Sequence, residues 1–284
     1  MNAKIAVAQI DSVLGNIEAN VSRHLKSIDQ AKKAGAQIIV FPELSLTGYT
    51  VKDMNWDLAM NLSKVPAVLQ PLVDASQTIS IIAGGIEEDQ DFRLFNSAFL
   101  FENGLLSSAH KKVYPPTYGM FEELRYFSKG ESVRAIHTKH GKIGVLVCED
   151  LWHLPLPYLL AQEGASVIVA LVASPTRLGG NEQELANARV NMENHKAYAR
   201  LLTTYLVFCN RVGYEDGVNF WGGSSVTGPD GETVALAKYF DEDLILASVD
   251  DNEIRRARRF SKHFLDDEMN LVLRELIRIE KNRS

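Results

Sequence analysis

The chain alternates between short apolar runs and longer stretches whose apolar residues recur at helical spacing. Runs rich in β-branched and aromatic residues predict strands at 4–10, 37–41, 79–84, 97–102, 142–148, 166–172, 204–209, 233–237 and 244–249. Helical spacing predicts helices over 17–34, which stops at Gly35, over 182–202 and over 266–280. There is no repeat, low-complexity segment or Pro/Gly/Ser linker. We therefore predict one α/β domain over residues 1–284.

Several of the predicted strands are continuously apolar. "QIIVF", "IGVLVC" and "VIVALV" do not alternate with polar residues, which is typical of strands that are covered on both faces. This pattern indicates sheets with helices outside them rather than an open all-β sandwich. Proteins of this kind usually place their chemistry in the loops at the carboxyl ends of the strands.

Composition narrows the class of protein. The 284 residues are 46% hydrophobic and 23% charged, as in an ordinary globular chain, and the net charge of −6 argues against nucleic acid as a partner. The basic stretch at 255–260 is short, so we interpret it as a solvated helix face or a subunit contact. No apolar run is long enough for a membrane helix, and the first residues do not resemble a signal peptide. With two cysteines and no disulfide framework, we expect a reduced, cytoplasmic protein.

Two strand ends carry unusual polar residues. Glu43 follows "QIIVF", and a carboxylate behind a buried strand is unfavourable unless it is paired or used. Cys148 closes "GVLVC" and is followed at once by Glu149 and Asp150. A lone cysteine in a strand is usually a small buried hydrophobe, and Cys209 fits that interpretation. Cys148 differs because its run stops at the cysteine, so we expect it at the rim of a sheet, where a base or cation could activate it.

The third unusual stretch, "HKKVYPPTYGMFEELRYF" at 110–127, combines two lysines with many aromatic residues. One interpretation is a surface loop with a solvated basic pair. Its aromatic content instead favours a packed wall, with one lysine pointing inward.

Other patterns give weaker indications. "HTKH" at 137–140 offers two histidines, but no further ligands have zinc-like spacing, so we expect no metal. "WGGSSVTG" at 221–228 is neither a nucleophile elbow nor a phosphate-binding loop, and predicts a tight turn before a strand. The remaining histidines, including His153, have no clear acid partner, which makes a Cys–His dyad an inferior alternative.

Together the three stretches resemble the nitrilase, or carbon–nitrogen hydrolase, superfamily. The resemblance rests on "FPELSLTGY", "KVYPPTYGMFEELRYF" and "VLVCEDLW", in that order, and continues through 164–175 and 210–232. It implies a four-layer αββα sandwich with two sheets face to face and helices outside. It also implies a homodimer or larger homo-oligomer, for which 269–282 offers an apolar helical face, although that face could simply pack on its own subunit.

The resemblance implies a triad of Glu43, Lys112 and Cys148, with no cofactor. Cys148 is the expected nucleophile, Glu43 the proton carrier and Lys112 the stabiliser of the oxyanion. Glu123 is the expected second acid, with Glu122 as the less favoured choice. The expected reaction is hydrolysis of a non-peptide C–N bond in a small amide through a thioester.

Within the superfamily, the lysine and cysteine stretches are most similar to the glutaminase domain of glutamine-dependent NAD synthetases. The resemblance implies substrate contacts from Tyr118, Glu123 and Ser174, which match this branch, with Trp152 lining the pocket. We expect Tyr49 as a further substrate-binding residue. That branch places a basic residue after "SP" to hold the substrate carboxylate. Here Gly180 stands in the expected place and Arg177 is a displaced candidate.

Several functions stay open. The chain has no "SGG-x-D-S" pyrophosphatase loop, so we expect a free-standing amidase, with a glutaminase subunit that feeds a separate NAD synthetase as the alternative. An N-carbamoyl amidohydrolase needs the same triad. A nitrilase is disfavoured because Glu149, rather than Trp, follows the cysteine. A silent scaffold protein is disfavoured because no triad residue is lost.

Overall fold

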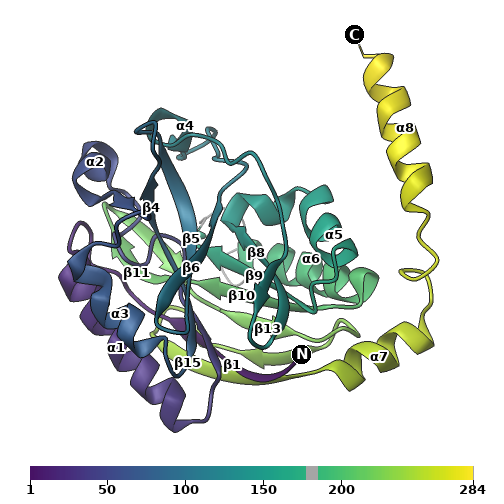
Figure 1. The fold of residues 1–284 in the computed structure, drawn as a ribbon, viewed down its shortest axis with the longest axis horizontal. Helices are drawn as coiled ribbons and strands as arrows, with labels where there is room; N and C mark the ends of the chain where they lie inside the picture. Colours follow the sequence, from purple (N-terminus) through teal and green to yellow (C-terminus); the bar gives the residue numbers. More distant parts are fainter. Residues whose placement is uncertain (177–184, 284) are drawn as a thin grey trace.

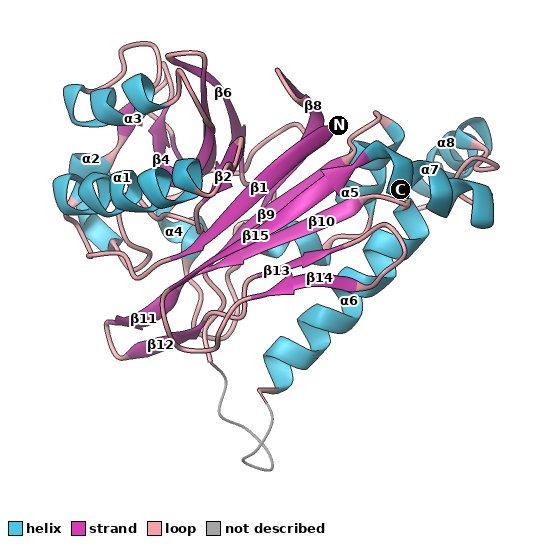
Figure 2. Cartoon of the chain, turned by 90° about the horizontal axis from the view of Figure 1, so that it is seen from below, coloured by secondary structure: helices cyan, strands magenta, loops and turns pink. Residues whose placement is uncertain are grey.

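The protein contains two β-sheets that lie face to face, with helices on the outer side of each (Figures 1 and 2). A computed structural model describes residues 1–176 and 185–283. The first sheet runs in the order β15 (Asp243–Asp250), β1 (Asn2–Gln9), β2 (Ile38–Val40), β4 (Ser80–Glu88), β5 (Leu94–Glu102) and β6 (Leu105–Lys111), with β3 (Met60–Asn61) beside β4. The second runs β14 (Thr233–Leu236), β13 (Ser225–Thr227), β10 (Tyr205–Asn210), β9 (Val167–Val172), β8 (Gly141–Val147) and β7 (Ile136–Thr138).

Helices α1 (Ile17–Lys33) and α3 (Gln70–Ala75) cover the first sheet, and α5 (Pro155–Gln162) and α6 (Ala186–Leu202) cover the second (Figure 2). The shorter elements are the hairpin β11 (Val212–Glu215) and β12 (Val218–Trp221), and the helices α2 (Asn55–Leu58) and α4 (Glu123–Tyr126). The Asn16 side chain caps α1 by accepting a hydrogen bond of 2.9 Å from the Ala19 amide. The predicted four-layer αββα architecture is confirmed.

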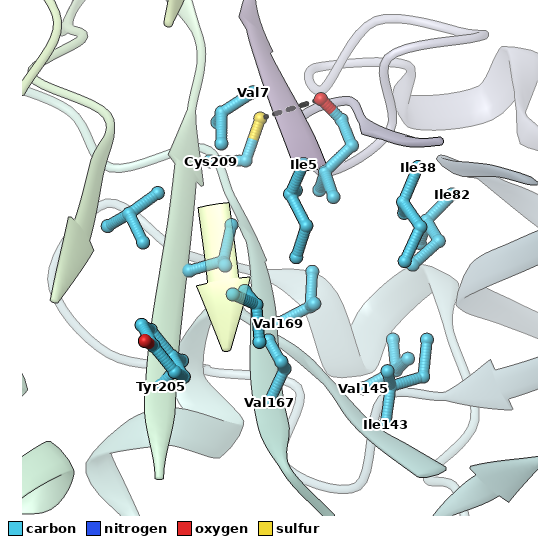
Figure 3. Packing of buried hydrophobic residues seen from close by; sticks show 14 of the residues in the cluster. Ile5, Val7, Ile38, Ile82, Ile143, Val145, Val167, Val169, Tyr205 and Cys209 are labelled. Atoms are coloured by element: carbon cyan, nitrogen blue, oxygen red, sulfur yellow. Dashed lines mark hydrogen bonds between the residues drawn. The ribbon is translucent and has the colours of Figure 1, made fainter. Parts of the chain in front are cut away.

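Alternate residues of the deeply buried strands enter different cores, which explains why these strands are apolar throughout. In β9, Val167, Val169 and Leu171 face the other sheet, whereas Ile168 and Ala170 face the helices. Figure 3 shows the core between the sheets, where β-branched side chains from both sheets meet. Covering a strand on both faces removes all of its apolar surface from water.

Two helices extend the chain beyond the sandwich. Helix α7 (Asp251–Phe260) follows β15, and α8 (Met269–Lys281) projects away from the body of the molecule (Figure 1). No residue of α8 is buried, although it carries a run of large apolar side chains. The basic stretch predicted as a solvated helix face lies on α7, where Arg258 is half-buried and the neighbouring arginines are exposed.

The strands that carry the notable residues end at one rim of the sandwich. β2 and β4 run parallel in the first sheet, and β8, β9 and β10 run parallel in the second. The loop after β2 is hydrogen-bonded to the residue after β9, and the loop after β6 is hydrogen-bonded to the turn after β8. Segments that are far apart in the sequence therefore meet at this rim.

Candidate active site

Glu43 lies in the loop after β2 and is almost fully buried, with 1% of its surface exposed. Its Oε2 accepts a hydrogen bond of 2.9 Å from the Ala173 amide, just after β9. Its Oε1 accepts hydrogen bonds of 2.7 Å from Lys112 Nζ and 2.8 Å from Asn96 Nδ2. The carboxylate behind the buried strand is thus paired on both oxygens, as its burial requires.

The Glu43 loop lies directly on β4, and Gly84 makes this possible. A Cβ atom at Gly84 would lie 2.3 Å from the Leu44 amide nitrogen and 2.7 Å from the Pro42 carbonyl oxygen. Leu44 itself has a left-handed backbone with φ of +48°. The loop therefore holds a tight conformation against a strand that has no side chain in its way.

Lys112 follows β6 directly, and its side chain lies between two carboxylates. Its Nζ donates hydrogen bonds of 2.7 Å to Glu43 Oε1 and 2.7 Å to Glu123 Oε1. Burial alone would lower the pKa of this ammonium group, but the charges on Glu123 and Glu43 hold the pKa well above its usual range. Lys112 therefore remains a cation at neutral pH. Of the two adjacent lysines, Lys111 instead forms an ion pair of 3.3 Å with Glu87.

Glu123 opens the short helix α4 and completes the cluster of charges. Its Oε1 accepts a hydrogen bond of 2.6 Å from the Tyr49 hydroxyl as well as the one from Lys112. Burial raises the pKa of Glu123 to about 6, although Lys112 opposes the shift. The residue is 5% exposed, whereas the alternative acid, Glu122, is exposed to solvent. Of the two acids, the structure brings Glu123 to Lys112.

Cys148 begins a 3₁₀ turn, η3 (Cys148–Trp152), directly after β8. Its φ of +46° is in the left-handed region that residues with a side chain rarely adopt. Such conformations persist where the surroundings enforce them, often at functional sites. Desolvation and the charge of Glu43 raise the pKa of the thiol well above its usual value, while Lys112 acts in the opposite direction. The resting thiol is therefore protonated and needs a base to become a nucleophile.

The second cysteine has a different environment. Cys209 is fully buried between the sheets, and its thiol donates to the Val40 carbonyl oxygen at 3.4 Å (Figure 3). The interpretation of Cys209 as a small core residue is confirmed, and Cys148 is partly exposed.

The expected substrate-contact residues differ in exposure and in their hydrogen-bond partners. The Tyr118 hydroxyl donates to Glu149 Oε2 at 2.9 Å, and about half of the Tyr118 surface is exposed. Trp152 is 49% exposed at the end of η3. Ser174 accepts a hydrogen bond of 3.0 Å from Trp221 Nε1. The Tyr49 hydroxyl donates its hydrogen bond to Glu123 Oε1. Arg177 and Gly180 lie outside the described residues.

The aromatic wall is packed only in part. Phe127 is buried, and the ring of Tyr114 stacks on that of His153 with centroids 3.4 Å apart. Tyr118 and Met120 are exposed, so the tip of the loop faces solvent. A cavity of about 300 Å³ lies beside it and reaches Tyr49 and Glu123. The remaining lining residues are Thr50, Val51, Lys52, Met120, Phe121, Glu122, Tyr126, Phe127, Asp216 and Val218.

Sequence reasoning gave no role to three residues of the site, Asn96, His110 and Asp150. Asn96 on β5 donates to Glu43 and, at 3.5 Å, to Glu123 Oε2.

The interpretation that the remaining histidines lack an acid partner is wrong for His153, whose Nε2 lies 3.9 Å from Glu149 Oε1, and for His110. His110 Nε2 lies 3.0 Å from Asp150 Oδ2, across 40 residues of the chain. The contacts of Asn96 and His110 join residues that are far apart in the chain, and no local pattern indicates them.

Two classes of feature are not found in the described part of the chain. Residues 1–176 and 185–283 contain no group of three or more His, Cys, Asp or Glu side chains arranged to hold a metal ion. Within the same residues, no helix has the length and apolar character that crossing a bilayer requires.

Comparisons with known proteins show the family and the fold. The profile of the family described as Carbon-nitrogen hydrolase matches residues 4–259. A glutamine-dependent NAD(+) synthetase from Thermotoga maritima is 30% identical over 254 residues, which cover 88% of this chain and 42% of that protein. The chain spans less than half the length of the first such curated relatives, 42% to 44%.

Two solved structures have the same fold over nearly the whole chain. A carbon-nitrogen hydrolase from Helicobacter pylori G27 superposes with a TM-score of 0.83 at 23% identity, covering 97% of this chain and 99% of that one. An amidase from Nesterenkonia sp. AN1, solved with the acetamide moiety of fluoroacetamide added covalently at its active-site cysteine, gives a TM-score of 0.77 at 22% identity, covering 96% of each chain. With its sandwich fold and a family match over residues 4–259, this chain belongs to the carbon–nitrogen hydrolase family.

Proposed function

We propose that this protein hydrolyses a non-peptide C–N bond in a small amide through a thioester on Cys148. The observation that carries the proposal is the buried Lys112 ammonium held 2.7 Å from both Glu43 and Glu123. The turn that Cys148 begins is hydrogen-bonded, through Asp150, to the residues directly after Lys112. A nucleophile, a base and a fixed cation are the groups that acyl transfer requires.

In the first half-reaction, Cys148 Sγ attacks the amide carbon while Glu43 takes the thiol proton. The C–S bond forms and the carbonyl electrons move to oxygen, where Lys112 and a backbone N–H stabilise the negative charge. Glu43 then gives its proton to the leaving nitrogen, the C–N bond breaks, and ammonia or an amine departs. The acyl group remains on sulfur as a thioester.

In the second half-reaction, Glu43 takes a proton from water and the resulting hydroxide attacks the thioester carbon. The C–O bond forms, the oxyanion is stabilised as before, and the C–S bond breaks. The proton held by Glu43 returns to Cys148, and the carboxylic acid product leaves. Glu123 holds the ammonium of Lys112 in position through both half-reactions, because its Oε1 is fixed by Tyr49 on the other side.

Glutamine is the second candidate substrate, and it would make the chain a source of ammonia for a separate NAD synthetase. Similarity to glutamine-dependent NAD(+) synthetases at 30% identity supports this candidate. The Glu149 carboxylate, which accepts from Tyr118 beside Cys148, offers a partner for an α-ammonium group. N-carbamoyl compounds fit the same chemistry, and only the shape of the pocket would distinguish them.

Ammonia release from a panel of substrates tests the proposal. The panel contains simple aliphatic amides, glutamine, an N-carbamoyl amino acid and a nitrile. We expect turnover of at least one amide by the wild type, a loss of roughly 10⁴-fold or more in Cys148→Ala and retained activity in Cys209→Ala. Turnover that persists in Cys148→Ala contradicts the proposal. A folded wild type that hydrolyses no C–N bond supports the silent-scaffold alternative instead.

The protein is further proposed to be a homodimer or a larger homo-oligomer. The support is the exposed apolar face of α8, which has no buried residue. Its large exposed side chains are Met269, Leu271, Val272, Leu273, Leu276, Ile277 and Ile279. A contiguous apolar surface of this kind is typical of an interface.

A further inference from the structure

Asp150 lies two residues after the proposed nucleophile, in the turn η3, and is completely buried. A buried carboxylate is unfavourable unless donors surround it. Donors come to this carboxylate from both β6 and β8. Oδ1 accepts hydrogen bonds of 2.9 Å from the amides of Val113 and Tyr114, and Oδ2 accepts bonds of 3.1 Å from the Val147 amide and 3.0 Å from His110 Nε2.

In the sequence, these hydrogen-bond donors lie next to or near two of the three proposed triad residues. His110 lies two positions before Lys112, and Val113 follows it directly. The Val147 amide lies immediately before Cys148. One carboxylate therefore joins the end of β6, which carries the ammonium, to the end of β8, which carries the thiol. The proposed chemical steps do not use Asp150 itself.

We propose that Asp150 is a positioning residue that fixes the distance between the Cys148 thiol and the Lys112 ammonium. This inference rests on the proposed function, because that distance matters where Lys112 must meet an oxyanion formed at the carbon that Cys148 attacks. The left-handed backbone of Cys148, with φ of +46°, needs such an enforcing contact. A displacement of about 1 Å in a site of this kind lowers the rate about 100-fold.

The carboxylate cannot be replaced by an amide of the same shape. In Asp150→Asn one oxygen can still accept from Val113 and Tyr114. The NH₂ group would then face the Val147 amide, so that two donors oppose each other. The turn before Cys148 loses its hydrogen bond and is free to shift relative to Lys112.

Two thiol reagents distinguish a displacement of Cys148 relative to Lys112 from a general loss of structure. In conjugate addition, Cys148 Sγ bonds to the β-carbon of acrylamide and the C=C electron pair moves toward the amide oxygen, giving an enolate. The enolate then takes up the proton that the thiol released. Iodoacetamide reacts differently, because the S–C bond forms as the C–I bond breaks, iodide leaves and Glu43 takes the thiol proton. No charge develops on the carbonyl oxygen. Only the acrylamide reaction therefore depends on a well-placed Lys112.

The experiment measures amide turnover and the rates at which both reagents modify Cys148, by mass spectrometry, in the wild type, Asp150→Asn and Asp74→Asn. Asp74 is an exposed helical residue far from the site and serves as the control. In Asp150→Asn we expect kcat to fall about 100-fold with KM within about 3-fold of the wild type. Acrylamide addition should fall about 30-fold and iodoacetamide alkylation less than about 3-fold.

Other results overturn the inference. An unchanged ratio of acrylamide to iodoacetamide rates in Asp150→Asn means that Asp150 does not place Lys112. An equal loss with both reagents, accompanied by labelling of the buried Cys209, shows that Asp150 only supports the fold. If the wild type releases no ammonia and its Cys148 is no more reactive than Cys209, the proposed function itself fails, and the inference fails with it.

His110 provides a second test if Asp150→Asn does not fold. His110→Gln keeps an N–H donor near the position of Nε2, whereas His110→Leu removes it. We expect the acrylamide rate, relative to the iodoacetamide rate, to be close to that of the wild type in His110→Gln and to fall about 5-fold in His110→Leu. Equal ratios in the two variants overturn the inference.

Discussion

Lys112 is the residue on which the electrostatics of the site depend. Its ammonium separates Glu43 from Glu123, and both contacts are 2.7 Å long. In Lys112→Met the two carboxylates face each other without a cation, so we expect a loss of activity of about 1,000-fold and of stability by about 3 kcal/mol. Denaturant unfolding and ammonia release measure the two effects. Lys111→Met is the matched control, and an equal effect in it would contradict this account.

Tyr49 sets the acid side of the pH profile. The hydrogen bond from its hydroxyl lowers the pKa of Glu123, which burial nevertheless raises to about 6. Tyr49→Phe removes the donor, so the pKa of Glu123 should rise and the carboxylate should protonate at a higher pH. If ionised Glu123 is needed to hold Lys112, the acid limb of kcat/KM lies near pH 6 in the wild type and moves upward in Tyr49→Phe. An unmoved limb shows that another group controls it.

The residues that sequence reasoning found share one feature. Glu43, Lys112 and Cys148 each follow a strand within a recognisable local motif. Asn96 and Asp150 act through contacts that span 53 and 37 residues of the chain. Asn96 stands at an ordinary polar position of a strand, and the motif that contains Asp150 does not indicate which residues its carboxylate will contact. Such contacts depend on how two strand ends meet, which needs the tertiary structure.

At the scale of elements, the packing of the Glu43 loop on β4 gives a further prediction. Gly84→Ala places a methyl group within 3 Å of the loop backbone, so the loop must move. We expect kcat to fall roughly 10- to 100-fold through displacement of Glu43, with the molecule still folded. In the control Gly228→Ala, the nearest atom to the new methyl group belongs to the flexible Asp230 carboxylate. Full activity in Gly84→Ala would show that the loop can shift without harm.

At the contact between α6 and β10, a buried histidine predicts that the protein loses stability in acid. His195 on α6 is buried against Phe208, neither ring nitrogen has a partner in the described structure, and burial lowers its pKa to about 3. The unfolded chain titrates near the usual pKa of about 6.5, so between these values it binds more protons than the folded state. The contribution of neutral His195 to the free energy of unfolding is therefore fully present above pH 6.5. It falls on acidification, by about 2–3 kcal/mol at pH 4.5.

His195→Phe should remove this share of the acid sensitivity. Urea unfolding at pH 7 and pH 4.5 measures it, and His137→Asn, at an exposed strand position, is the control. A variant whose stability falls with pH as steeply as that of the wild type would rule out His195 as the source.

The elements differ in how clearly the sequence indicated them. The predicted strands that lie deep in the sandwich agree with the structure to within a few residues, because burial on both faces leaves an unbroken apolar run. The exception is the carboxyl end of β4, which was predicted to end at residue 84 but continues to Glu88. β6 was missed because it is an edge strand whose residues "LLSSAHK" are largely polar and half-exposed. The short strands β11 and β12 form a separate hairpin and carry too few residues for a periodic pattern.

At the scale of the whole molecule, α8 is a helix that has no buried residue. Its apolar residues are exposed and it projects from the body (Figure 1). If it mediates self-association, replacing Leu273 and Leu276 together with Glu should reduce the molar mass found by sedimentation to that of one chain, 31.6 kDa. Asn270→Asp is the control on the same helix. An unchanged mass in the double variant would mean that α8 is not the contact.

The most direct test of the account is the mass of the intact protein during turnover of an amide that it hydrolyses. Samples quenched in acid should contain a fraction that is heavier by the acyl group minus one hydrogen, and peptide mapping should place the addition on Cys148. The adduct should disappear in Cys148→Ala and should form in Cys209→Ala. Hydrolysis without any adduct on Cys148, and at an undiminished rate in Cys148→Ala, would contradict the thioester mechanism.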